Sequence, residues 1–194
     1  MSIKNNKKFD KLFIKKYLGL YKESLFNTDV EDQLIKLKKI ILNVKKDKNK
    51  VIIVGNGGSA AISSHVSVDL TKVVGVKAIN FNEADLLTCL SNDYGYERWV
   101  EKALEFYSNK GDLVILISSS GSSKNIVLGA KKAKQLGLQL VTFTGFNFNN
   151  KLKKYGDLNF WLDSKAYNII ENTHLIWLLT VCDLIIGKAE YKSS

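Results

Sequence analysis

The 194-residue chain is 45% hydrophobic, which is enough for one domain whose core needs no disulfide or metal. Its net charge of +10 comes almost wholly from lysines spread over many segments, with Arg98 the single arginine, so a nucleic-acid partner is not expected. No apolar run reaches the roughly 18 residues of a membrane span and no signal-type core is present, which predicts a cytoplasmic protein without a membrane partner.

Two helices are expected before the first strand. Apolar residues recur at three- and four-residue spacing over residues 9–26, with lysine on the other face, which predicts an amphipathic helix. A second helix is expected from Thr28, because its spacing from Glu31 fits a capping box, and it ends in a solvated lysine run at residues 45–50. These helices should cover one face of a sheet or a partner subunit.

From Val51 onward, short apolar runs rich in β-branched residues alternate with Gly/Ser turns and helical patterns. Strands of this kind are buried on both faces and form parallel βαβ units. The fold class is therefore α/β, with a doubly wound five-stranded parallel sheet in a single domain. Residues 1–50 form its helical segment and residues 51–190 its core. The expected strands are residues 51–54, 78–81, 113–117, 138–144 and 158–162.

The two cysteines, Cys89 and Cys182, lie far apart and match no metal or redox spacing. Both fall in apolar stretches, where a small buried thiol is common. We expect both to be buried, reduced and inert.

The loop after the first strand, Gly55-Asn-Gly-Gly-Ser59, runs into a helix that begins near Ala60. Its glycines let the backbone approach an anion closely, and Ser59 can cap the helix and add a hydroxyl donor. The order differs from the dinucleotide fingerprint, and no Gly-Lys-Ser/Thr makes a nucleotide loop, so no nucleotide cofactor is expected. A tight structural turn is the alternative.

The loop after the third strand, Ser118-Ser-Ser-Gly-Ser-Ser123, precedes a helix expected over residues 124–136. Five hydroxyls at a helix N-terminus form a dense set of donors for one phosphate group. A flexible linker or glycosylation segment does not fit, because the strand before it and the helix after it are strongly patterned. A nucleophilic serine lacks a triad context.

Residues 30–190 resemble the sugar isomerase (SIS) family, and three segments in order are similar to its phosphoheptose isomerase branch. They are Gly55-Asn-Gly-Gly-Ser-Ala60, Asn92-Asp-Tyr-Gly95 and Ser118-Ser-Ser-Gly-Ser-Ser123. The resemblance implies a cytoplasmic homotetramer that converts sedoheptulose 7-phosphate to D-glycero-D-manno-heptose 7-phosphate for lipopolysaccharide or a related polysaccharide. The implied substrate-binding residues are Asn56, Gly57, Gly58, Ser59, Asn92, Asp93, Ser118, Ser119, Ser120, Ser123 and Glu171.

Isomerisation of an aldose and a ketose needs a base that moves a proton between neighbouring carbons, and an acid or metal that polarises the carbonyl. His65 and Asp69 are four residues apart and share one face of the helix after the first loop. This spacing suits an acid/base pair or two ligands of a metal such as zinc. The alternative is a surface aspartate with a buried histidine bonded to backbone. The family has Glu where this chain has Asp69.

The carboxy-terminal helix departs from the family pattern. Glu171 takes the place of a Gln, and Leu179 takes the place of a catalytic, metal-ligating His. Glu171 and His174 share a helical face, which permits a rearranged site in which His65, Asp69 and Glu171 act in catalysis or hold zinc. The alternative is that His174 is structural, within a subunit interface. The nearly all-apolar remainder of the helix predicts burial in a tetramer core.

Two functions remain open. An isomerase acting on a phosphorylated heptose or a similar sugar, with Asp69 or Glu171 as base, is favoured by the phosphate and sugar motifs. A non-catalytic phosphosugar- or protein-binding SIS module, like the DnaA initiator-associating protein, is suggested by Leu179. A kinase is disfavoured, because neither loop supplies the lysine and the magnesium-binding acids.

Overall fold

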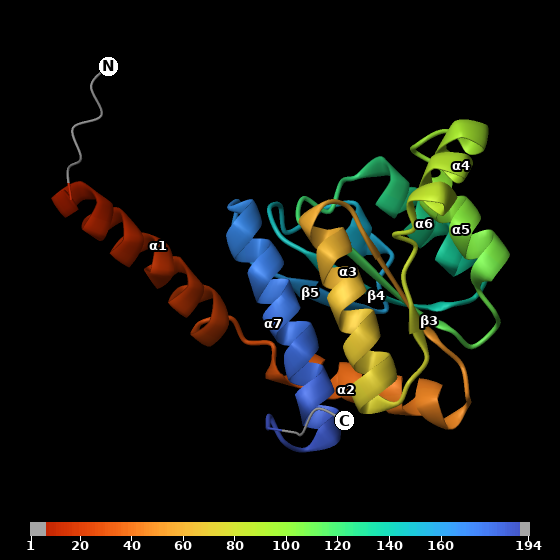
Figure 1. Ribbon diagram of the computed structural model, residues 1–194, viewed down its shortest axis with the longest axis horizontal. Coiled ribbons are helices and arrows are strands. Elements are labelled where there is room, and N and C mark those ends of the chain that lie inside the picture. Colours follow the sequence, from red (N-terminus) through yellow and green to blue (C-terminus); the bar gives the residue numbers. More distant parts are fainter. Residues whose placement is uncertain (1–6, 191–194) are drawn as a thin grey trace.

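The computed structural model describes residues 7–190, and it places five parallel strands between two layers of helices (Figure 1). The strands and helices agree with the expected α/β class. The elements in chain order are α1 (Lys7–Phe26), α2 (Glu31–Lys46), β1 (Val51–Gly55), α3 (Gly58–Asp69), the π-helical turn η1 (Leu70–Val74), β2 (Ala78–Ile79), α4 (Ala84–Tyr94), α5 (Trp99–Tyr107), β3 (Leu113–Ser118), α6 (Lys124–Gln135), β4 (Gln139–Thr144), the 3-10 turn η2 (Leu152–Lys154), β5 (Leu158–Trp161) and α7 (Tyr167–Ile186).

The sheet has the order β2-β1-β3-β4-β5, and all neighbouring strands are parallel. The chain passes from β1 outward to β2 and then returns to place β3 on the other side of β1. The connections therefore diverge between β1 and β3, which is where open α/β sheets bind ligands. Because Gly55 lies opposite Ile117, the loops that follow these two strands end at the same edge.

Successive residues of each strand point to opposite faces of the sheet, so they pack into two separate hydrophobic cores. Ile53, Ile115 and Phe143 point to the layer of α2, α3 and α7, while Ile52 and Val114 point to the layer of α4, α5 and α6. Every residue of β1 and β3 is buried. The expected strand at residues 78–81 is shorter, because Asn80 forms a turn in which its side chain accepts the backbone N–H of Asn82 at 3.1 Å.

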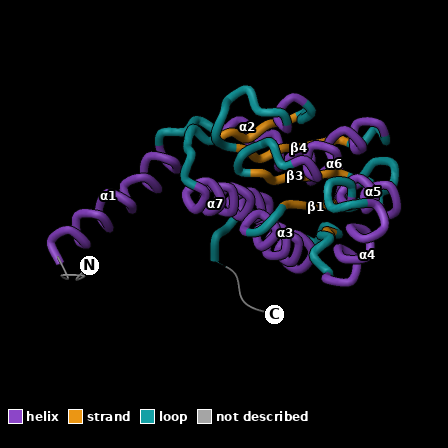
Figure 2. Tube along the Cα trace, turned by 90° about the horizontal axis from the view of Figure 1, so that it is seen from above, coloured by secondary structure: helices purple, strands orange, loops and turns teal. Residues whose placement is uncertain are grey.

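The two amino-terminal helices behave differently. Figures 1 and 2 show α1 projecting away from the body, whereas α2 lies under the sheet and packs against α7 and β5. The predicted capping box of Thr28 and Glu31 is wrong: α2 begins at Glu31 after Val30, with no side-chain cap. The helix is held by its apolar face instead, through the fully buried Leu37 and Ile41.

Helix α7 is long and apolar enough to cross a membrane by length and composition alone, with a mean hydropathy of 1.6 over its most apolar window. In the fold it is a core helix, packed against α2 and α3. Ile170, Trp177 and Val181 are among its buried residues, although Ile176 and Leu184 remain exposed.

Candidate phosphate site

The glycine loop reaches its neighbours too closely for any side chain. Gly57 has a φ of 55°, in the left-handed region that favours glycine. A Cβ added to Gly58 would collide with the carboxylate of Glu171, and one added to Gly55 would collide with Ser59. Ser59 was predicted to cap the following helix. It lies instead inside the first turn of α3, buried, and Gly57 precedes the helix without a side-chain cap.

Three helix N-termini meet around a cavity of about 130 Å³, which we call the phosphate cavity. Helices α3, α6 and α7 all begin there, and the dipoles and first-turn backbone N–H groups of helix N-termini favour an anion. The volume equals roughly four water molecules, the scale of a phosphate group rather than a whole sugar. The residues that line the cavity are Asn56, Ser59, Ile117, Ser118, Ser119, Ser120, Ser123, Tyr167 and Glu171.

Hydroxyl and amide groups dominate the lining of the phosphate cavity. Among the described residues that line it none is a lysine or arginine, so an anion there would be held by neutral donors and helix ends. Ser118 Oγ donates to Ser123 Oγ at 3.2 Å, which joins the two ends of the serine loop. Ser122, the one hydroxyl of that loop outside the lining, is exposed.

Glu171 is the one acidic side chain among the described residues that line the phosphate cavity. It extends from the first turns of α7 toward Gly58, and Ser119 Oγ donates to its Oε1 at 3.5 Å. Burial raises the pKa of this carboxyl above its ordinary value, and the bond from Ser119 opposes the shift only in part. A raised pKa suits a group that must both accept and return a proton.

Asn56 is held by a residue that the sequence did not single out. Its Nδ2 donates to Asn125 Oδ1 at 2.9 Å, and Asn125 Nδ2 donates back to Asn56 Oδ1 at 2.8 Å. The Tyr96 hydroxyl approaches the same Oδ1 at 3.5 Å. These contacts join the loop after β1, the first turn of α6 and the turn between α4 and α5.

His65 and Asp69 form a pair, as their spacing predicts, with Nε2 and Oδ2 separated by 3.5 Å. The His65 side chain is 52% exposed, so the alternative of a buried histidine is wrong. Asp69 lies 11 residues after Gly58, which is about 16 Å along the helix. Burial, and then the charge of Asp69, raise the pKa of the Cys182 thiol, so Asp69 lies near Cys182. Cys182 comes 11 residues after Glu171 on α7. Helices α3 and α7 therefore run side by side in the same direction (Figure 1), and the pair lies far from Glu171.

The predicted zinc ligands His65, Asp69 and Glu171 are consequently not together in one chain. Across residues 7–190 no three His, Cys, Asp or Glu side chains gather in a way that could hold a metal ion. Two ligands, His65 and Asp69, are placed for a metal, but the usual zinc site has three or four protein ligands. The donor set of a single chain does not fit zinc, and we derive no catalytic step through it.

His174 is a core residue rather than a member of an open site. Its ring is fully buried, with Nε2 at 3.1 Å from the Thr144 carbonyl and its edge against Phe143. Burial lowers the pKa of His174 to about 4, so the ring is neutral near pH 7 and donates through Nε2. Its partner belongs to the same chain, which differs from the expected subunit interface.

Asn92 and Asp93, predicted to contact the sugar, lie at the exposed end of α4 and do not line the phosphate cavity. Asn92 donates to Asp93, and the other Asp93 oxygen is 3.7 Å from the thiol of Cys89. Cys89 is exposed, so the prediction that both cysteines are buried is wrong for it and confirmed for Cys182. The side of α4 that carries Cys89 faces out of the core.

Sequence reasoning missed three residues of the site: Tyr96, Asn125 and Tyr167. Tyr96 directly follows the Asn92–Gly95 segment, and Asn125 directly follows the serine loop and Lys124. Both could have been found by extending each motif by two residues. Tyr167 had no such signal, because its place depends on where α7 begins relative to the sheet.

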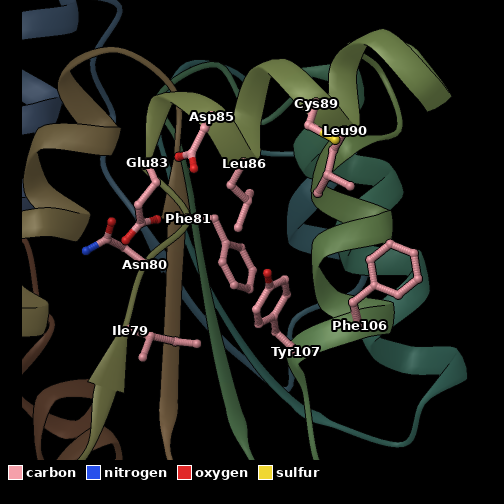
Figure 3. Close-up of a pocket in the computed structure, with 10 residues that line it drawn as sticks. All are labelled: Ile79, Asn80, Phe81, Glu83, Asp85, Leu86, Cys89, Leu90, Phe106 and Tyr107. Atoms are coloured by element: carbon pink, nitrogen blue, oxygen red, sulfur yellow. The ribbon is translucent and has the colours of Figure 1, made fainter.

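A larger cavity of about 750 Å³ lies elsewhere, between β2, α4 and α5 (Figure 3). The rings of Phe81 and Tyr107 form its floor, with centroids 5.6 Å apart, and the carboxylates of Glu83 and Asp85 lie to one side. Apolar walls and two carboxylates are unsuited to phosphate, so we assign the phosphate site to the smaller, polar cavity.

The fold, the switch point and the two serine- and glycine-rich loops define a domain of the sugar isomerase type, and residues 17–145 match the family model described as SIS domain. The chain is 33% identical over 162 residues to a phosphoheptose isomerase of Aliarcobacter butzleri, covering 80% of this chain and 85% of that protein. It is 31% identical over 184 residues to one of Helicobacter pylori, covering 91% and 95%. This chain belongs to the phosphoheptose isomerase family.

Solved structures agree on the fold. The phosphoheptose isomerase of Neisseria gonorrhoeae matches with a TM-score of 0.84 at 21% identity, over 93% of this chain and 98% of that one. The enzyme of Francisella tularensis matches with a TM-score of 0.83 over 95% and 100%. The likeness therefore extends to the helices on both sides of the sheet, α1 included in part.

Proposed function

We propose that this protein is an aldose-ketose isomerase that interconverts sedoheptulose 7-phosphate and D-glycero-D-manno-heptose 7-phosphate, or a closely similar sugar phosphate. The observation that carries the proposal is the phosphate cavity, where three helix N-termini, a serine loop and one carboxylate converge. The named relatives are phosphoheptose isomerases, which supports the reaction class.

The serine loop and helix ends hold the phosphate group and thereby fix one end of the substrate. Each charge-assisted hydrogen bond from a hydroxyl or backbone N–H to a phosphate oxygen contributes about 1.5–3 kcal/mol. Ser118, Ser119, Ser120 and Ser123 supply the hydroxyls, and Asn56 supplies an amide donor at the cavity edge. Binding at the unreactive end leaves the carbonyl end of the sugar to be positioned for proton transfer.

We assign the base to Glu171, the one acidic group among the described residues that line the phosphate cavity. Its carboxylate takes the proton from C1 of the ketose and returns it to C2, while one proton moves from O1 to O2, so the isomers balance atom for atom. The raised pKa of Glu171 increases its basicity, and its base form is lost as pH falls through that pKa. Asp69 remains the second candidate, but a base there would act on a substrate bound elsewhere than in its own chain's cavity.

A non-catalytic sugar-phosphate or protein-binding module is not favoured. The curated relatives that cover most of this chain are named as isomerases. The replacement of the expected histidine by Leu179 removes one proton carrier, but it leaves Glu171 in the cavity.

The proposed assembly is a homotetramer, in which a second copy of the chain would cover the exposed apolar side chains of α1. Seven large apolar side chains of this helix are at least 42% exposed, and the helix projects away from the body (Figure 1). An exposed apolar face of this kind marks an interaction surface, and a second copy of the chain presents the same face. The exposed residues are Phe9, Leu12, Phe13, Ile14, Leu18, Leu20 and Phe26.

The heptose phosphate product would enter lipopolysaccharide or another surface polysaccharide, and we place the protein in the cytoplasm, where sugar phosphates are made.

Purified protein incubated with sedoheptulose 7-phosphate should form the aldose, measured by NMR. Failure to convert any seven- or six-carbon sugar phosphate would exclude the isomerase. Light scattering should give four times the chain mass, and Phe9→Glu with Phe13→Glu should lower it, while Lys11→Glu with Lys15→Glu on the opposite side of the same helix should not.

A further inference from the structure

Asn56 and Asn125 form a closed pair of amides in which each side chain donates one hydrogen bond to the other and accepts one in return. The two distances, 2.9 and 2.8 Å, are normal for N–H···O bonds. Asn56 lines the phosphate cavity, whereas Asn125 does not and is only 3% exposed. A buried amide whose acceptor and donor are both matched holds its partner in one orientation.

We propose that Asn125 is a positioning residue, which fixes the Asn56 amide at the edge of the phosphate cavity and ties the glycine loop to the serine loop. The inference rests on the proposed function, because it assigns the role of Asn125 in binding the phosphorylated sugar. Asn56 is the contact residue, and Asn125 acts through it.

The pairing determines what Asn56 can offer a ligand. Its oxygen accepts from Asn125 Nδ2 and lies 3.5 Å from the Tyr96 hydroxyl, so both of its lone pairs face protein donors. One of its two N–H groups donates to Asn125, and the other has no partner among the described residues. Asn56 therefore presents a donor to the substrate, and the atom that it meets is an acceptor such as a phosphate or sugar oxygen.

Neighbouring contacts strengthen the same connection. Lys124, adjacent to Asn125, forms an ion pair with Glu97 at 2.7 Å, and Glu97 is adjacent to Tyr96. The turn between α4 and α5 is thus attached both to the amide pair and to the residue beside it. Without Asn125, the glycine loop would lose its side-chain connection to the start of α6, and Asn56 could rotate away from the cavity.

The decisive variant is Asn125→Asp. An ionised aspartate offers two acceptors to an amide that needs one donor and one acceptor, so one oxygen faces Asn56 Oδ1 and repels it. A protonated aspartate restores the reciprocal pair, because its O–H donates to Oδ1 while its carbonyl accepts from Nδ2. Burial favours the protonated form and raises the pKa of such a carboxyl above its ordinary value of about 3.9.

The experiment titrates inorganic phosphate and sedoheptulose 7-phosphate into wild type, Asn125→Asp and Asn125→Leu by calorimetry at about pH 8 and about pH 5. We expect Asn125→Asp to bind roughly 10-fold more weakly than wild type at the higher pH and within about 3-fold at the lower. Asn125→Leu should be weak at both. In the isomerase assay, KM should rise more than kcat falls, because the change affects binding of the unreactive phosphate end.

Asn168→Asp is the matched control, since it adds the same charge at an exposed position beside the cavity residue Tyr167 without touching Asn56. The ratio of its dissociation constant to that of wild type should be the same at both pH values, unlike the ratio for Asn125→Asp. Equal weakening of Asn125→Asp at both pH values, or wild-type affinity in both Asn125 variants, would overturn the positioning role. Loss of sugar-phosphate binding in the wild type itself would overturn the proposed function as well, so the two failures are distinguishable.

Discussion

The phosphate cavity and the His65–Asp69 pair share helix α3 but are built differently. The lining of the cavity comes from β3, α3, α7 and two loops, and its side chains are held by hydrogen bonds: Ser118 with Ser123 inside the lining, and Asn56 with Asn125 behind it. The pair consists of two side chains one turn apart on one helix, with His65 half exposed, and it lies about 10 to 16 Å along α3 from Gly58. The phosphate cavity is thus formed within one chain, whereas the second set of candidate catalytic groups is not joined to it.

The largest expected effect separates the two regions directly. Glu171→Gln keeps the shape of the side chain and removes the only carboxylate among the described residues of the cavity lining. Because general acid/base catalysis contributes about 10²- to 10⁴-fold, we expect kcat to fall by at least about 100-fold with phosphate affinity retained. The assay is conversion of sedoheptulose 7-phosphate, with Glu83→Gln, an exposed glutamate that does not line the phosphate cavity, as control.

If Glu171→Gln stays active and Asp69→Asn loses activity, the base is Asp69. The phosphate cavity would then only bind the substrate, and the His65–Asp69 pair would carry out the proton transfer. A substrate held in one cavity would then be served by the His65–Asp69 pair of another chain. In that case, mixing Asp69→Asn with a Ser118→Ala, Ser123→Ala variant, which keeps the pair but loses two phosphate donors, would restore part of the activity. A mixed assembly would then join an intact cavity of one chain to an intact His65–Asp69 pair of another.

The second expected effect concerns stability behind the cavity. His174 has a pKa of about 4 in the folded protein against 6.5 when exposed, so the unfolded state binds more protons between these values. The free energy of unfolding should therefore be unaffected above pH 6.5 and fall by about 3 kcal/mol as pH drops toward 4. Urea unfolding as a function of pH measures the loss.

His174→Gln should show a smaller decline over the same pH window, because its amide stays neutral and can still donate to the Thr144 carbonyl. His65→Gln is the control, since that ring is half exposed. A parallel pH dependence in wild type and His174→Gln would show that other groups cause the acid sensitivity.

The third effect tests the cavity lining one residue at a time. Ser123 lines the phosphate cavity, while its neighbour Ser122 is exposed. Ser123→Ala should weaken binding of inorganic phosphate by about 10-fold, the loss of one hydrogen bond to a charged group, and Ser122→Ala should leave it unchanged. Equal effects of the two substitutions would place the phosphate outside the cavity.

The sheet and both loops could be predicted from the sequence because each depends on local signals. Continuous β-branched runs such as Leu113–Ile117 determine buried strands, and the loops follow directly from them. What failed depends on packing between distant segments. The orientation of α4 left Cys89 exposed, and the parallel course of α3 and α7 separated Asp69 from Glu171 within one chain. No periodicity in a single helix carries that information.

The smallest expected effect lies at the rim of the cavity. The Tyr96 hydroxyl is 3.5 Å from Asn56 Oδ1, at the limit of a hydrogen bond, and the ring is 55% exposed. Tyr96→Phe should therefore weaken sedoheptulose 7-phosphate binding by only about 2- to 3-fold, because Asn125 still holds the amide. Calorimetry beside Tyr94→Phe, a nearby exposed tyrosine, measures the difference. A loss as large as that of Ser123→Ala would mean that the hydroxyl contacts the substrate itself, and the phosphate cavity would then extend to the turn between α4 and α5.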